Sequence, residues 1–167
     1  MAQQTFYHAC FAAGTTVRTL LGDRAIETIR VGDQVLTQSP ETGRLSFQPV
    51  VAAYHNKPNR ILRIHLDGET VGATPIHRFW KAGVGWTMAR DLKPGDAIRA
   101  VGGPVRVRSI EQGPIEPVYN LKVAEGQSFF VGKQRLLVHD NSLVRPALRP
   151  FDAAPELAAI TAPAAAP

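Results

Sequence analysis

The stretch Ala9–Val17 reads ACFAAGTTV and holds Cys10, the only cysteine among the 167 residues. A single cysteine excludes an internal disulfide and a cysteine-rich metal site, so this thiol is either a small buried apolar group or a nucleophile. It lies where the strand-like body of the chain begins, which favours a nucleophile that attacks the peptide bond on its own N-terminal side. Such a thiol can attack the Ala9 carbonyl carbon through a five-membered cyclic intermediate and convert the amide into a thioester. This N-to-S shift needs a donor for the departing nitrogen, a base for the thiol and oxyanion donors, and histidine is the usual proton carrier.

The body of the chain, from Cys10 to Asn141, has the pattern of an all-β protein. Runs that alternate in polarity or are rich in β-branched residues predict strands, and turns with Gly or Pro separate them. Segments 25–29 and 88–92 are expected to form single helical turns, and no stretch has a long 3.6-residue period. The predicted strands are Thr16–Leu20, Gln34–Gln38, Gln48–Tyr54, Ile61–Leu66, Val105–Glu111, Val118–Val123 and Phe129–Val131.

The body also contains an internal repeat, in which three pairs of segments recur in the same order at similar offsets. The pairs are Ile29–Val35 with Leu92–Ile98, Ile61–Leu66 with Val118–Val123, and Thr74–His77 with Leu136–His139. The repeat predicts duplicated β-subdomains with pseudo-two-fold symmetry, in which each half supplies one histidine, His77 or His139, to a shared site. The alternative is that Gly-Asp turns recur by chance in β proteins.

Short motifs along the body complete the pattern that starts at Cys10. They are Cys10-Phe-x-x-Gly14-Thr15-x-Val17, a second run from Ile26 to Leu36, Thr74-x-x-His77, a run from Val118 to Gly132, and Leu137-Val138-His139-Asp140. Together they resemble the Hint domain, the self-processing module shared by inteins, bacterial intein-like proteins and the C-terminal part of hedgehog proteins. The resemblance covers Cys10 to about Asn141 in the family's order. It implies an all-β Hint fold without an inserted homing endonuclease.

The resemblance also implies roles at the N-terminal junction. Cys10 is then the nucleophile of the acyl shift, and His77 polarises or protonates the nitrogen of the Ala9–Cys10 bond, which Thr74 orients. Asn120 departs from the family's pattern, because splicing inteins commonly have an acidic residue or a cysteine there. Gln127 departs too, because many have a histidine there.

At the C-terminal junction the resemblance is weaker. His139 resembles the penultimate histidine that assists cleavage, and Asp140 occupies the place of the usual terminal asparagine. Asp140 lacks the amide nitrogen with which an asparagine cyclises, so its carboxylate offers a poorer route to cleavage. In an alternative register Asn141 is the terminal residue and Ser142 is the acyl acceptor.

We therefore expect single-turnover autocatalytic cleavage in cis between Ala9 and Cys10, with possible C-terminal cleavage near Asp140 and Asn141. The expected partners are the upstream flanking polypeptide and water or a small thiol as acyl acceptor. Two alternatives stay open. One is full protein splicing through Asn141 and Ser142, and the other is an inactive Hint fold that serves as a structural or binding module.

Composition and charge set the remaining expectations. Residues 1–9 are expected to be a flank, residues 10–141 the Hint domain, and the Ala/Pro-rich residues 142–167 a disordered tail. The net charge of +5 is spread along the chain rather than clustered, which disfavours nucleic-acid binding. No apolar run suggests a membrane span and no signal peptide is visible, so the cellular location is left open. We expect a monomer without a cofactor or a metal.

Overall fold

The computed structural model describes residues 9–144, 147 and 151–152. In these residues nearly all regular structure is β-strand, and the only helical elements are the single-turn 3₁₀ helices η2 (Ile26–Thr28) and η3 (Ala89–Asp91). Both helical turns lie inside the segments expected to form them. The all-β fold class is therefore confirmed. Among the described residues there is no helix that could span a membrane.

Twelve strands are present in the described residues, and ten of them are five residues long or shorter. All belong to one hydrogen-bonded network in which β1 lies between β6 and β10. The strands are β1 (Phe11–Ala12), β2 (Thr16–Thr19), β3 (Gly22–Ala25), β4 (Gln34–Gln38), β5 (Leu45–Leu66), β6 (Glu69–Ala73), β7 (Arg78–Lys81), β8 (Gly85–Met88), β9 (Ala97–Ile98), β10 (Val105–Val123), β11 (Ser128–Val131) and β12 (Leu136–His139).

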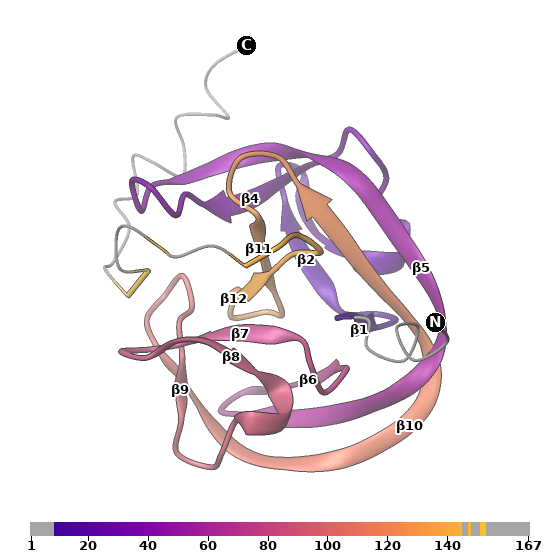
Figure 1. Cartoon of the computed structure of the whole chain (residues 1–167), viewed down its shortest axis with the longest axis vertical. Helices are drawn as coiled ribbons and strands as arrows, with labels where there is room; N and C mark the ends of the chain where they lie inside the picture. The colour runs from indigo at the N-terminus through magenta and orange to yellow at the C-terminus, as the bar shows by residue number, and fades with distance from the viewer. Residues whose placement is uncertain (1–8, 145–146, 148–150, 153–167) are drawn as a thin grey trace.

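The two long strands, β5 and β10, pair antiparallel and curve together around one side of the molecule (Figure 1). Sequence patterns predicted four separate strands here, and that prediction is wrong in one respect: each pair of predicted strands is one continuous strand. The interruption was expected because prolines cannot donate to a β-ladder. The register instead shifts between Gln112 and Ile115 and between Glu116 and Val118, so that β-bulges accommodate Pro114 and Pro117.

The first repeat pair forms two matching turns. Gly32 and Gly95 both have φ of +96°, a left-handed conformation that favours glycine. The carboxylates of Asp33 and Asp96 each accept a hydrogen bond from the backbone N–H three residues earlier, at 2.9 and 2.8 Å. Each turn is then bonded to one of the long strands, β5 or β10. This correspondence is part of the predicted pseudo-two-fold arrangement.

The hydrophobic core fixes the start of the domain in place. Phe11 of β1 is fully buried, and its ring packs edge-on against Phe79 of β7 and Phe129 of β11, at 5.9 and 6.0 Å between centroids. Burying an aromatic side chain of this size contributes on the order of 2–3 kcal/mol. Because β1 is paired on both sides, Cys10, which directly precedes it, is held inside the sheet network as well.

The expected tail lies mostly outside the described residues, as do residues 1–8 of the expected flank. The described part of residues 142–167 includes Phe151, which is 1% exposed, and Asp152, which accepts a hydrogen bond from Trp80. These two residues pack against the body of the domain. An unpacked tail was expected because one phenylalanine in an Ala/Pro-rich run supplies little apolar surface.

Candidate functional site

The Ala9–Cys10 peptide bond is held by Thr74, the residue that follows β6. The backbone N–H of Cys10 donates to Thr74 Oγ1 at 2.9 Å, and the backbone N–H of Thr74 donates to the Cys10 carbonyl at 2.9 Å. Both residues are 1% exposed. The side chain that the resemblance assigned to orienting this bond therefore contacts the nitrogen that would leave in an acyl shift.

The carbonyl oxygen of Ala9 has its own donor, the side-chain amide of Asn120 on β10. The orientation of that amide is fixed, because Asn120 Oδ1 accepts the backbone N–H of Leu121 at 2.8 Å and leaves Nδ2 directed at Ala9. An N–H donor at a carbonyl is the geometry that stabilises an oxyanion. The sequence analysis treated Asn120 only as a departure from the family's pattern and missed this contact.

His77 lies at the end of the tight turn that begins at Thr74, with its backbone N–H donating to the Thr74 carbonyl at 3.1 Å. Its side chain is fully buried, with Phe11 4.0 Å away between ring centroids. Nε2 lies 2.9 Å from the carbonyl oxygen of His139. A carbonyl can only accept, so Nε2 carries the proton. Nδ1 of the neutral ring is then an unprotonated nitrogen, buried and without a hydrogen-bond partner in the described residues.

Burial controls the protonation of His77. It lowers the pKa of the imidazole to about 3, although contacts with the backbone of His139 and Ala9 act in the opposite direction. His77 is therefore neutral at physiological pH. It can accept a proton on Nδ1, and once protonated it is a strong acid that gives the proton up readily.

The thiol of Cys10 is also buried, and burial raises its pKa to about 11. Asn56 on β5 partly offsets this effect, because its Nδ2 donates to Sγ at 3.0 Å and so stabilises the thiolate. At neutral pH the group is a thiol, and it must lose its proton before or during attack. Asn56 belongs to no motif of the sequence and was not predicted.

At the C-terminal junction, Asp140 and Asn141 are hydrogen-bonded to β10. His139, the last residue of β12, places Nδ1 2.8 Å from the Asp140 carbonyl oxygen, and burial lowers its pKa. Asp140 is 3% exposed; its Oδ2 accepts the Val123 backbone N–H at 2.7 Å, and burial raises the pKa of its carboxyl. Asn141 is exposed and donates its backbone N–H to the Leu121 carbonyl at 2.8 Å.

The two junctions share an open pocket of about 180 Å³. Its lining includes Ala9, His77 and the segment from His139 to Ser142. All six predicted site residues therefore lie in one region, with Cys10, Thr74 and His77 around the N-terminal bond and His139, Asp140 and Asn141 around the C-terminal one. The two histidines of the repeat are brought together by the His77–His139 contact.

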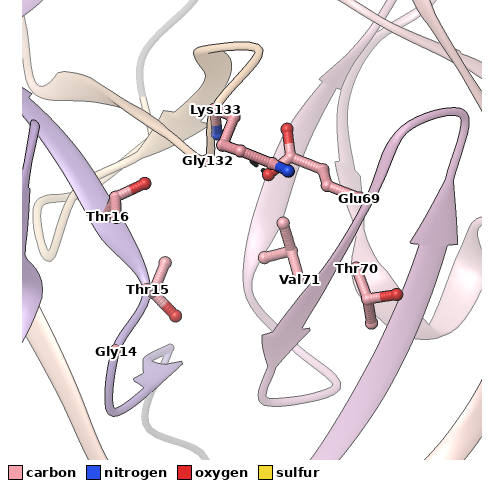
Figure 2. Close-up of a pocket in the computed structure, with 8 residues that line it drawn as sticks. All are labelled: Gly14, Thr15, Thr16, Glu69, Thr70, Val71, Gly132 and Lys133. Carbon is pink, nitrogen blue, oxygen red and sulfur yellow. Dashed lines mark hydrogen bonds between the residues drawn. The ribbon is translucent and has the colours of Figure 1, made fainter.

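A second hollow, of about 340 Å³, lies away from these residues (Figure 2). Figure 2 shows the Glu69 side chain crossing toward Gly132 and Lys133. Its two carboxylate oxygens accept the backbone N–H groups of Lys133 and Gln134, both at 2.9 Å. Glu69 is thus engaged in fixing the turn between β11 and β12. We assign this hollow no part in the candidate site.

Comparisons with known proteins agree with this geometry. Residues 16–141 match the family model described as the pretoxin HINT domain. Among curated proteins, none matches the chain by sequence. The solution structure of a bacterial intein-like domain from Clostridium thermocellum is 30% identical, with a TM-score of 0.76, over 80% of this chain and 100% of that one.

Two intein crystal structures share the fold at lower identity. A DnaB intein from Synechocystis is 17% identical, with a TM-score of 0.71, over 81% of this chain and 100% of that one. The gp41-1 intein is 22% identical, with a TM-score of 0.67, over 80% of this chain and 100% of that one. The family match and the fold agree, and this chain belongs to the Hint domain family, as a pretoxin HINT domain.

Proposed function

We propose that this domain cleaves the Ala9–Cys10 peptide bond in cis, through an N-to-S acyl shift at Cys10. One observation carries the proposal: the reacting peptide group has a separate polar partner at each end. Asn120 donates to its carbonyl oxygen, and Thr74 accepts from its nitrogen. The thiol belongs to the residue that supplies this nitrogen, so nucleophile and electrophile are neighbours in the chain.

The proposed reaction is an isomerisation followed by a transfer. The Cys10 sulfur loses its proton and attacks the Ala9 carbonyl carbon, and the resulting oxyanion accepts a hydrogen bond from Asn120 Nδ2. The carbon–nitrogen bond then breaks, the proton lost from sulfur ends on the Cys10 nitrogen, and Ala9 is left as a thioester. A small thiol or water attacks this thioester, releases the upstream segment and regenerates the Cys10 thiol.

His77 is the proton carrier in this scheme. Its Nδ1 is free to accept a proton, and its low pKa makes the protonated ring a strong donor to the departing nitrogen. Thr74 contributes by fixing the nitrogen in place. A backbone amide that leaves as an amine needs such a proton, because expelling an amide anion is prohibitively unfavourable.

An inactive binding module would explain these contacts less well. Asn56 and Asn120 both direct amide donors at the reacting groups, onto Sγ of Cys10 and onto the Ala9 carbonyl oxygen. Burying polar side chains costs free energy unless they are hydrogen-bonded, and apolar residues could fill the same space. Their placement on the thiol and on the carbonyl favours chemistry at this bond.

Full splicing is a second candidate, favoured by the pocket that Ala9 and Ser142 share. In that reaction the Ser142 hydroxyl would take the acyl group from Cys10, and cyclisation of Asn141 would break the second junction. A ligated product that joins Ala9 directly to Ser142 would be diagnostic. In this register Asn141 cyclises and Asp140 is the residue before it, which agrees with an Asp140 carboxylate whose Oδ2 already accepts the Val123 backbone N–H. The name pretoxin HINT domain further suggests that the parent is a toxin precursor.

The proposal is tested by intact mass of the purified chain with and without dithiothreitol. Cys10→Ala should abolish loss of the nine residues before Cys10, and Ser142→Ala should leave this loss intact. Thr70→Ala is the control, because Thr70 lies on β6 near Thr74 in sequence and contacts His65 rather than the reacting bond. Cleavage that survives in Cys10→Ala would refute the mechanism.

A further inference from the structure

Both tryptophans of the chain lie on the β7–β8 hairpin and form an aromatic site next to the C-terminal junction. Trp80 of β7 and Trp86 of β8 are cross-strand partners, with ring centroids 5.2 Å apart and perpendicular planes. Trp86 also packs edge-on against His139, at 4.9 Å. Nothing in the acyl shift requires two tryptophans here.

The site is filled by Phe151, ten residues past Asn141. Its ring centroid lies 4.7 Å from that of Trp80 and 5.7 Å from that of Trp86, both in edge-on arrangements. Phe151 is only 1% exposed, although the sequence around it is Ala/Pro-rich. Edge-on aromatic pairs of this kind contribute more to stability than the burial of their apolar area alone.

The next residue, Asp152, is held by polar groups of the same hairpin. Its Oδ1 accepts from the Trp80 indole Nε1 at 3.0 Å and from the backbone N–H of Gly83 at 3.1 Å. Asp152 and the guanidinium of Arg99 line a common pocket of about 210 Å³, and Arg99 is 3% exposed. The hairpin therefore offers two N–H donors to the carboxylate of Asp152, and Arg99, which follows β9 (Ala97–Ile98), adds a positive charge nearby.

We propose that the β7–β8 hairpin binds the downstream flank of this same chain and recognises in it an aromatic residue followed by an acidic one. The aromatic pair selects Phe151, and the two N–H donors select the carboxylate of Asp152. The flank is then attached to the domain at two places, at the Asn141 backbone and at Phe151. This docking goes beyond the proposed cleavage and is independent of its chemistry.

The two tryptophans allow a direct test, because the chain gives only two indole N–H signals in a ¹H–¹⁵N spectrum. The whole chain is used with Cys10→Ala, which blocks the proposed cleavage at Ala9–Cys10, and intact mass verifies that residues 142–167 are still attached. Phe151→Ala should shift both indole signals and expose both rings to quenching by acrylamide. Asp152→Ala should shift the Trp80 signal and remove its protection from hydrogen exchange. Asp152→Asn, which keeps an acceptor but loses the negative charge, should lower this protection to a smaller extent.

Leu143→Ala is the matched control, because Leu143 lies in the same flank and is 87% exposed. It should leave both indole signals unchanged. Backbone signals of β4 and β5 report whether each variant is folded. The proposal is overturned if folded Phe151→Ala and Asp152→Ala chains give the same indole signals and quenching as Leu143→Ala.

Discussion

Replacing Asn120 with alanine should slow thiol-induced cleavage at Ala9–Cys10 while leaving the domain folded. The side chain makes two hydrogen bonds, to the Ala9 carbonyl oxygen and from the Leu121 backbone N–H. Only the first of these contacts faces the reacting bond. The variant therefore separates a role in the transition state from a role in the strand.

The magnitude follows from these two contacts. Loss of one oxyanion donor typically lowers a rate by about 10²–10³-fold, or roughly 3–4 kcal/mol in the barrier. Loss of the acceptor for the buried Leu121 N–H costs about 1–3 kcal/mol of folding free energy. Domains are commonly stable by about 5–15 kcal/mol, so the variant should remain folded at 25 °C.

The assay is the single-turnover rate of loss of residues 1–9, followed by intact mass in dithiothreitol. Asn59→Ala is a suitable control, since Asn59 lies on β5, opposite Glu116 rather than Asn120 in the β5–β10 pairing. Urea unfolding of both variants measures the folding cost separately. A folded Asn120→Ala chain that cleaves within about twofold of the wild-type rate would refute the oxyanion role, because a lost donor should cost far more.

Three further predictions concern His77, Thr74 and the turn at Gly132. Below pH 6.5 the His77 imidazole is protonated in the unfolded chain but stays neutral in the folded one, so the free energy of unfolding should fall by about 1.4 kcal/mol per pH unit toward pH 3. His77→Gln should reduce this pH dependence in urea titrations, and an unchanged dependence would mean that other groups cause it. Thr74→Val keeps the side-chain shape but removes the acceptor for the Cys10 N–H, so cleavage followed by mass should slow by about tenfold, and an unaltered rate would exclude the contact from the mechanism. Gly132→Ala places a Cβ 2.6 Å from Glu69 Oε1 at a φ of +82°, so thermal unfolding should show a loss of about 1–3 kcal/mol; an unchanged melting temperature would contradict the geometry.

The sequence predicted the fold class because its strand signals are local. Alternation and turn residues mark β4 at its observed bounds, and the two Gly-Asp turns revealed the repeat. Very short strands such as β1 and β9 were not predicted, because two residues carry no periodicity. Their pairing depends on contacts with distant strands, which no local pattern contains.

The candidate site was predictable only where its residues sit in compact motifs. Thr74 and His77 belong to one tight turn, so residues that are close in the sequence are also close in the fold. Asn56 lies in the middle of β5 and Asn120 near the end of β10, and they reach Cys10 and Ala9 only through the pairing of β5 with β10 and of β1 with β10. Phe151 was missed for a related reason, since its partners Trp86 and Trp80 lie 65 and 71 residues earlier in the chain.

The most direct test of the account is the chemical form of the released upstream peptide. The chain is incubated with 2-mercaptoethanesulfonate, and the peptide Met1–Ala9 is identified by mass. The account predicts a peptide that carries the thiol as a C-terminal thioester on Ala9, formed faster at higher thiol concentration. Release of the free acid at the same rate with and without thiol would contradict a thioester at Cys10, and so would no release at all.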